Sequence, residues 1–243
     1  MAADSSSKNE GKIVIVAGGT GGLGRPVSLA FLKEGATVAV SYIKQDEFES
    51  LKAQAESGAA RLEGQALDVT NEATVGKFID AIVARHGRLD ALVNTVGGYI
   101  GGVKLWDLAT ADLDRMLSLN LRSGFVLARA AVRVMLKQGN GSIINVAAKA
   151  AVDPPGGASA YAASKAAAVA MIDSLAEDLK GTGVRVNSIL PSIIDTETNR
   201  QAIPSADFSK WPKPEEIARV VLFLASDDAR LICGASIPVY GNS

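Results

Sequence analysis

The chain has 243 residues, 48% of them hydrophobic, which is enough for one sizeable α/β domain with a large core. The formal net charge is -1, and the absence of any block of like charge argues against a nucleic-acid or anionic-membrane partner. A single cysteine, Cys233, excludes an internal disulfide, and no apolar run approaches the ~18 residues that span a bilayer. We therefore expect a cytoplasmic protein, with residues 1–10 as a flexible N-terminal tail and one domain over residues 11–243.

The first motif is a glycine-rich turn between a β-branched run and an apolar helical stretch. The run over 13–16 predicts a buried strand, glycines follow at Gly18, Gly22 and Gly24, and the helix is expected over 25–33. Glycines let a backbone approach a pyrophosphate, and a helix N-terminus adds N–H groups and a positive dipole. The spacing favours dinucleotide binding, whereas a tight structural turn is the simpler alternative.

The end of the second predicted strand, over 37–41, bears on which nucleotide is bound. An acidic residue that binds the ribose of NAD is expected there, but Tyr42 and Ile43 occupy these positions and Lys44 follows. The next acid, Asp46, looks like the start of a helix. This pattern favours NADP(H), with Lys44 or Ser41 near the 2′-phosphate, and leaves NAD(H) possible. The alternative for Lys44 is a solvated loop charge.

Strands and helices alternate along the rest of the chain. One further strand is expected to end near Leu67, and others are expected over 89–94, 142–146, 185–190 and 237–240. Further helices are expected over 46–57, in a segment that ends at His86, over 111–137, around Tyr161 and from about Pro214. This alternation predicts a single-domain, Rossmann-type, doubly wound parallel sheet with helices on both faces. With one histidine and one cysteine, no dedicated metal site is predicted.

The alanine-rich helix around Tyr161 carries the strongest candidate for chemistry. Tyr161 and Lys165 are four residues apart and should present a phenol and an ammonium on the same helix face. A nearby cation lowers the pKa of a phenol, so that Tyr161 could exchange a proton near neutral pH. The alternative is a solvated lysine and a half-buried tyrosine on an ordinary helix.

Taken together, these motifs resemble the short-chain dehydrogenase/reductase family from about residue 11 to 241. The resemblance implies catalytic roles for Tyr161, Lys165 and Asn120, with Lys165 also on the nicotinamide ribose and Asn120 holding a water that relays protons. It also implies a homodimer or homotetramer that acts on a small-molecule substrate. The cofactor-binding residues that we predict are Gly18, Thr20, Gly22, Leu23, Gly24, Tyr42, Lys44, Asp68, Val69, Asn94, Gly97, Tyr161, Lys165, Pro191, Ile194 and Thr196.

One departure from the family pattern concerns its catalytic serine. The position thirteen residues before Tyr161 is Ala148, which cannot donate a hydrogen bond to a reacting carbonyl oxygen. Removing one such donor can cost ~2.7–4 kcal/mol at the transition state. Ser142, Ser159 and Ser164 are the nearest alternatives, of which Ser159 lies in a loop that could reach the site.

A narrower resemblance is to the dihydropteridine reductase branch, which keeps the tyrosine and lysine but lacks the serine. The stretches 147–153 and 190–211 are similar to that branch, whereas Asn120 and the missing acid after the second strand are not. The expected reaction is reduction of a quinonoid dihydropterin or a similar conjugated imine or quinone. The alternatives are a carbonyl reductase acting on a ketone or 3-oxoacyl group, and a catalytically weak NAD(P)-binding regulatory protein.

Overall fold

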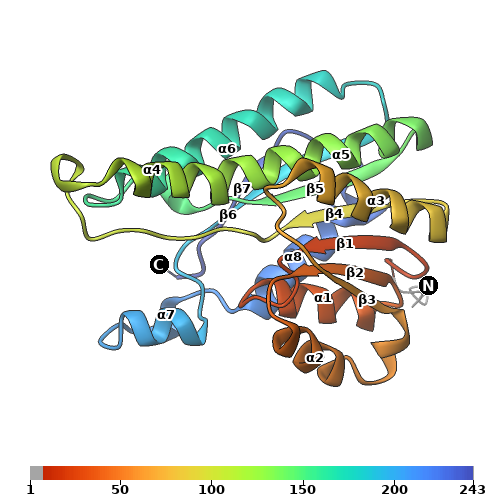
Figure 1. The fold of residues 1–243 in the computed structure, drawn as a ribbon, viewed down its shortest axis with the longest axis horizontal. Coiled ribbons are helices and arrows are strands. Elements are labelled where there is room, and N and C mark those ends of the chain that lie inside the picture. The colour runs from red at the N-terminus through yellow and green to blue at the C-terminus, as the bar shows by residue number, and fades with distance from the viewer. Residues whose placement is uncertain (1–7, 243) are drawn as a thin grey trace, which may run out of the picture.

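The computed structural model describes residues 8–242 and contains one seven-stranded parallel sheet with helices on both faces (Figure 1). The strands are β1 (Ile13–Ala17), β2 (Thr37–Tyr42), β3 (Leu62–Ala66), β4 (Ala91–Asn94), β5 (Gly141–Val146), β6 (Val184–Pro191) and β7 (Ser236–Val239). Their order across the sheet is β3-β2-β1-β4-β5-β6-β7. The predicted fold class, a doubly wound α/β sheet, is confirmed.

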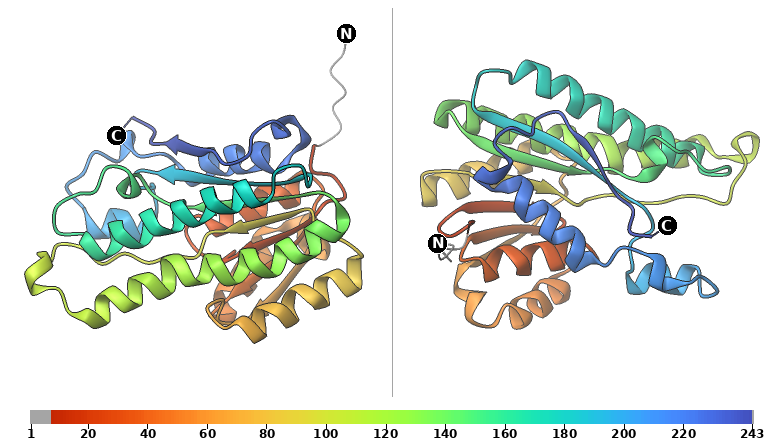
Figure 2. Two further views of the ribbon diagram at one scale, coloured as in Figure 1. Left: turned by 90° about the horizontal axis from the view of Figure 1, so that it is seen from above. Right: turned by 180° about the vertical axis from the view of Figure 1, so that it is seen from behind.

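The helices follow the apolar periodicity of the sequence. They are α1 (Gly24–Lys33), α2 (Gln45–Gln54), α3 (Glu72–His86), α4 (Thr110–Leu117), α5 (Ser123–Gln138), α6 (Ser159–Asp178), α7 (Glu197–Ala202) and α8 (Pro214–Ala225). One core joins α1, α2 and α8 to the sheet, and a second joins α3, α5 and α6 to its other face. Figure 2 shows both layers, with α7 standing away from the sheet. The apolar runs of β1 and β2 are buried because helices cover both of their faces.

The long helix that we predicted over 111–137 is α4 and α5, which join through one π-helical turn at Ser118–Arg122. Single π turns inside α-helices occur frequently at functional sites. Asn120, one of the three predicted catalytic residues, lies in this turn and is buried. The wider turn therefore marks the position where the helix brings a polar side chain towards the loop after β4 and towards α6.

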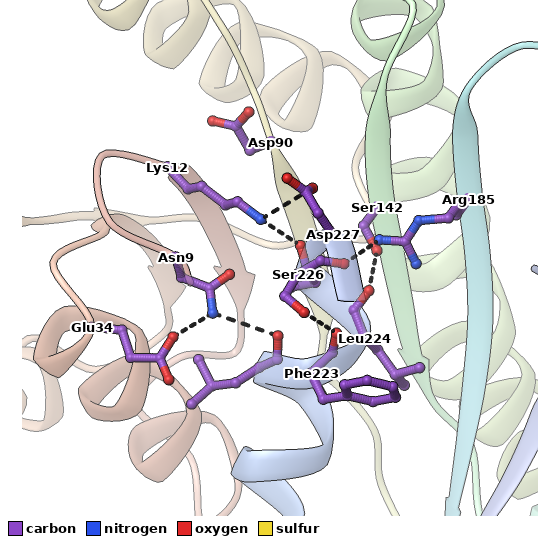
Figure 3. Close-up of polar contacts among 12 residues, drawn as sticks. Asn9, Lys12, Glu34, Asp90, Ser142, Arg185, Phe223, Leu224, Ser226 and Asp227 are labelled. Atoms are coloured by element: carbon purple, nitrogen blue, oxygen red, sulfur yellow. Dashed lines mark hydrogen bonds and ion pairs between the residues drawn. The ribbon is translucent and has the colours of Figure 1, made fainter. Parts of the chain in front are cut away.

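The first described residues contact the body of the domain. Asn9 is 1% exposed and donates to a carboxylate oxygen of Glu34. Gly11 N–H also donates to the Gly35 carbonyl at 3.3 Å. Figure 3 shows Asn9 between Glu34 and α8, so this polar side chain packs against the turn after α1. Residues 1–7 of the predicted tail lie outside the described residues, and the flexible tail over 1–10 stays a prediction.

Candidate active site

The winding of the sheet creates the place for a ligand. The chain leaves β1 towards β2 on one side, whereas β4 pairs with β1 on the other. In open α/β sheets ligands bind at such a switch point, outside the carboxyl ends of the strands. Thr95, just after β4, ties the two ends together, because its hydroxyl donates to the Ala17 carbonyl at 2.7 Å. The glycine-rich turn after β1 therefore faces the loop after β4.

The glycines of this turn are required by close approaches. A Cβ on Gly24 would lie 2.0 Å from the Gly18 carbonyl oxygen, and Gly18 has a φ of 73°, which favours glycine. A Cβ on Gly22 would lie 3.0 Å from Cγ2 of Thr196, on the segment after β6. Leu23 is buried and directly precedes α1. The turn therefore presents bare backbone at the N-terminus of α1, which fits the pyrophosphate of a dinucleotide.

Several other predicted cofactor residues lie on loops that follow the strands. Asn94, at the end of β4, donates to Oδ1 of Asn145 at 3.2 Å and accepts from Val96 N–H at 3.2 Å. A Cβ on Gly97 would lie 3.2 Å from Nζ of Lys165, so the loop after β4 runs directly beside this lysine. Their cofactor contacts stay predictions.

The segments after β3 and β6 also carry predicted cofactor residues. Asp68 is exposed after β3 and accepts from Thr70 N–H at 2.8 Å, whereas Val69 is buried. Pro191 ends β6, Ile194 packs against the core, and Thr196 caps α7 by accepting from Asn199 N–H at 3.3 Å. These positions follow the strands, as the family pattern requires.

The end of β2 differs from the expectation. The ring of Tyr42 is buried, stacks on Phe48 with centroids 4.7 Å apart and donates its hydroxyl to Gln45 at 2.6 Å. Its side chain therefore belongs to the core beneath α2, because the strand's alternation turns it inwards, and the predicted contact of this side chain with cofactor is not supported.

An acid that the sequence did not single out lies near the turn instead. Glu47, on α2, pairs with Lys44 at 3.2 Å and accepts from the hydroxyl of Thr20 at 3.1 Å. Thr20 belongs to the glycine-rich turn, so this contact places the carboxylate of Glu47 at the edge of the expected cofactor site. Sequence reasoning missed Glu47 because an acid that binds the ribose is expected directly after β2, whereas Glu47 lies in the first turn of α2.

Tyr161 and Lys165 lie on the first turns of α6, as predicted. Nζ of Lys165 is buried and donates to the Val146 carbonyl at 2.9 Å, at the carboxyl end of β5. Burial lowers the pKa of Lys165 to about 8, because a low-dielectric surrounding disfavours the ammonium. This contact joins α6 to β5 and fixes the depth of the lysine beside the loop after β4.

The expected lowering of the pKa of Tyr161 is not found in this conformation. Burial, and secondarily the neighbouring Tyr99, raise the pKa of Tyr161 to about 12. Lys165 does not lower this pKa, because its ammonium is directed at the Val146 carbonyl, and desolvation disfavours the phenolate. The prediction of a lowered pKa for Tyr161 is therefore wrong, and the phenol holds its proton at neutral pH.

Asn120 connects the π turn to both sides of the site. Its Oδ1 accepts from Gly98 N–H at 2.9 Å, and its Nδ2 donates to the Gly98 carbonyl at 3.0 Å and to Oγ of Ser164 at 2.9 Å. Both amide hydrogens are thus used within the protein. The observed role is to position the loop after β4 against α6, and the proton-relaying water stays a prediction.

Ala148 lies just beyond β5 and is 7% exposed. Two of the three alternative serines are excluded by position or partner: Ser142 donates to the Leu224 carbonyl at the opposite edge of the sheet, and Ser164 bonds to Asn120 and to the Tyr161 carbonyl. The Ser159 hydroxyl is buried and has no hydrogen-bond partner. Ser159 lies two positions before Tyr161, however, and residues two apart on a helix do not face each other.

Tyr99 is a site residue to which sequence reasoning gave no role. Its ring meets that of Tyr161 edge to face, with centroids 4.9 Å apart, yet Tyr99 is 65% exposed. A Cβ on Gly101 would lie 1.9 Å from the Tyr99 hydroxyl, so this glycine lets the ring lie over its own loop. The sequence feature that could have identified Tyr99 is an aromatic residue between two glycine pairs, at 97–98 and 101–102. Tyr99 therefore forms an aromatic wall beside the phenol of Tyr161.

The comparisons with known proteins agree with this geometry. A family model described as short chain dehydrogenase matches residues 12–206. The chain is 32% identical over 240 residues to a 3-oxoacyl-(acyl-carrier-protein) reductase of Thermotoga maritima, covering 96% of this chain and 97% of that one. The chain therefore belongs to the short-chain dehydrogenase/reductase family, and it is an NAD(P)-dependent oxidoreductase.

Two solved structures are similar over nearly the whole chain. ElxO with NADP bound has a TM-score of 0.90 at 27% identity, covering 95% of this chain and 98% of its own. NAD⁺-bound xylitol dehydrogenase has a TM-score of 0.89 at 27% identity, covering 96% and 99%. Because one neighbour holds NADP and the other NAD⁺, the family likeness does not distinguish the two nucleotides. It also does not single out the dihydropteridine reductase branch.

The first prediction concerns the phenol. Tyr161→Phe removes only the hydroxyl, so we expect kcat to fall ~10²–10⁴-fold, the usual contribution of a placed proton donor. Cofactor affinity, measured by fluorescence titration, should change less than about three-fold, because the glycine-rich turn is untouched. Full activity of this variant on every reducible substrate would make Tyr161 a structural residue.

The second prediction concerns the buried lysine. Its pKa of about 8 lies below the unfolded value of 10.5, so between these values the unfolded chain binds a proton that the folded protein lacks. The free energy of unfolding should therefore rise with pH across this window by up to about 3 kcal/mol from this group. Urea unfolding at about pH 7 and about pH 10 measures it.

Lys165→Met should abolish this rise, whereas Lys77→Met, an exposed charge-matched control on α3, should keep it. Both pH values lie at or below the ordinary pKa of tyrosine, so the raised pKa of Tyr161 contributes little. An equal pH dependence in the Lys165 variant would contradict the assignment.

Proposed function

We propose that the protein is an NAD(P)H-dependent carbonyl reductase whose proton donor is Tyr161. The observation that carries the proposal is the joint position of Tyr161 and Lys165 on α6, beside the end of β5 and the loop after β4 that lies against the glycine-rich turn. Similarity to a 3-oxoacyl-(acyl-carrier-protein) reductase supports a keto group as the reducible centre. A regulatory protein that only binds NAD(P) has no need for a phenol and a buried lysine at this place.

The reaction divides between the cofactor and the chain. When bound, the reduced nicotinamide supplies the hydride to the carbonyl carbon. Tyr161 then gives its hydroxyl proton to the carbonyl oxygen, which becomes the alcohol. Lys165, drawn from Val146 towards the ribose and the phenol, would stabilise the resulting phenolate until solvent returns the proton. The high pKa of Tyr161 keeps the proton on the phenol until it passes to the carbonyl oxygen.

Ala148 restricts the substrates that such a site can use efficiently. With a methyl group in place of a donor, the carbonyl oxygen has Tyr161 alone to stabilise its developing charge. Simple ketones should therefore react slowly, and activated ketones such as 3-oxoacyl compounds faster. This restriction favours a second candidate, reduction of a quinonoid dihydropterin, conjugated imine or quinone, whose charge spreads over a ring. The exposed ring of Tyr99 beside Tyr161 offers a surface on which a planar substrate could stack.

The third prediction tests these candidates. The unmodified protein is to be assayed with NADPH and NADH against a 3-oxoacyl thioester, a simple ketone, a quinone and a quinonoid dihydropterin. We expect the 3-oxoacyl compound to be reduced with a higher kcat/KM than the simple ketone. Reduction of the pterin or quinone with no activity on any ketone would replace carbonyl reduction by the second candidate. Binding of NADPH without turnover of any of them would support a regulatory protein.

The fourth prediction restores the missing donor. Ala148→Ser should raise kcat/KM for ketones by about ten-fold or more, because one donor at a developing oxyanion contributes ~2.7–4 kcal/mol when well placed. The change on a quinonoid pterin should be smaller. Ala147→Ser is the matched control, since the neighbouring side chain of an extended segment points to the opposite side. An equal gain in both variants would rule out a specific oxyanion contact.

The fifth prediction concerns the nucleotide. We propose a preference for NADPH, with Lys44 meeting the 2′-phosphate after leaving Glu47. Lys44→Ala should weaken NADPH binding about ten-fold, or 1.4 kcal/mol, with little effect on NADH. Glu47→Gln should strengthen NADPH binding by removing a competing carboxylate, and Lys52→Ala on the same helix is the control. Tighter binding of NADH than of NADPH by the unmodified protein would overturn the preference.

A further inference from the structure

A cavity lies at the amino ends of the strands, at the opposite edge of the sheet from Tyr161. Its volume is ≈ 540 Å³, which is within the usual range for small-molecule sites. The residues that enclose it precede β1, begin β5 and β6, and follow α8, so segments far apart in sequence meet around it. Figure 3 shows part of its wall, with Lys12 and Arg185 directed at the end of α8.

The lining is strongly cationic, although the chain as a whole carries a net charge of -1. Five basic side chains and two carboxylates line the cavity: Lys12, Arg88, Lys180, Arg185 and Arg230, with Asp90 and Asp227. The carboxylate of Asp90 is already matched, because it pairs with Arg88 and accepts from Ile13 N–H at 2.8 Å. Basic groups therefore outnumber the acids available to them.

Two of these cations are held mainly by neutral acceptors. Lys12 donates to the Ala225 carbonyl at 2.9 Å, and Arg185 donates to the Ser226 carbonyl at 3.1 Å. The carboxylate of Asp227 is fully solvated and 3.8 Å from Nζ of Lys12, too far for a hydrogen bond. Burial lowers the pKa of both cations, because the loss of hydration disfavours the charged form more than the neighbouring carboxylate stabilises it.

Capping of a helix explains only part of this arrangement. Cations near the last carbonyls of α8 are stabilised by its dipole, which accounts for Lys12 and Arg185. It does not account for the charge of Arg230, which lines the same cavity. Lys180 lies just after α6 and pairs with Glu177 of that helix. Among the described residues, Arg185 and Arg230 form no ion pair. The excess positive charge is thus directed at space that a ligand can enter.

We propose that this cavity binds a small, multiply charged oxyanion, a phosphate- or carboxylate-bearing molecule, at a site separate from substrate and cofactor. The guanidinium of Arg185 has five N–H donors, of which main-chain carbonyls use two. Guanidinium groups match phosphate and carboxylate oxygens in geometry, and the ammonium of Lys12 adds a point charge. Such a ligand supplies the counter-charge that the half-buried cations lack and joins β1, β6 and the end of α8.

Cys233 provides a local reporter for this site. It is the single cysteine of the chain, it is exposed, and it lines the same cavity. The rate of its alkylation by neutral iodoacetamide should fall several-fold as inorganic pyrophosphate or citrate is added at constant ionic strength. Saturating NADPH is present throughout, so that the expected cofactor site at the glycine-rich turn is occupied and the added anion does not bind there. The anion that protects at the lower concentration distinguishes a phosphate from a carboxylate ligand.

Two variants test whether the basic side chains are responsible. Arg230→Gln and Lys12→Gln should each raise the half-protecting concentration about ten-fold, whereas Arg133→Gln, an exposed site on α5, should leave it unchanged. Arg230 is exposed, so its replacement should not impair folding, and circular dichroism checks this for all three. Protection that is absent in the unmodified protein, or equal in all variants, would overturn the proposal.

Discussion

The contact between the ammonium of Lys165 and the Val146 carbonyl fixes the geometry on which the rest of the site depends. A buried charge needs such a partner, because an unpaired ammonium in a low-dielectric interior is costly. The contact joins α6 to the end of β5, and through the helix it sets the position of Tyr161. Asn120 adds a second connection, from the π turn to the loop after β4 and to Ser164. These contacts therefore join helix, strand and loop around the phenol of Tyr161.

The two edges of the sheet have different chemistry because parallel strands all begin at one edge and end at the other. At the carboxyl edge, bare glycine backbone and the N-terminus of α1 attract an anion with few charged side chains. At the amino edge, Lys12, Arg185 and their neighbours gather beside the end of α8. Both edges suit anionic groups, but the first does so through backbone dipoles and the second through formal charges. Among the described residues no helix is long and apolar enough to cross a membrane.

Much of the fold followed from local patterns. The alternation of β-branched runs with apolar helical periodicity predicted the parallel sheet, and the glycine spacing predicted the tight turn between β1 and α1, where we expect the dinucleotide to bind. The spacing of Tyr161 and Lys165 put both on one helix face, because four residues make about one turn. Composition says nothing of the buried contact that Asn9, within the predicted tail, makes with Glu34.

The sequence by itself determined the family and the fold class, and it put Tyr161 and Lys165 on one helix face, since these depend on spacing along the chain. The catalytic roles of the pair stay a prediction. The tertiary structure decided how those groups behave, because the pKa of a side chain depends on what surrounds it. Tyr161 has a raised pKa, contrary to expectation, and Tyr42 is a core residue rather than a surface of the expected cofactor site. Tyr99 meets Tyr161 only through folding of a glycine-rich loop, and the basic cavity joins segments from both ends of the chain. Contacts of this kind join residues far apart in the chain, so no local sequence pattern predicts them.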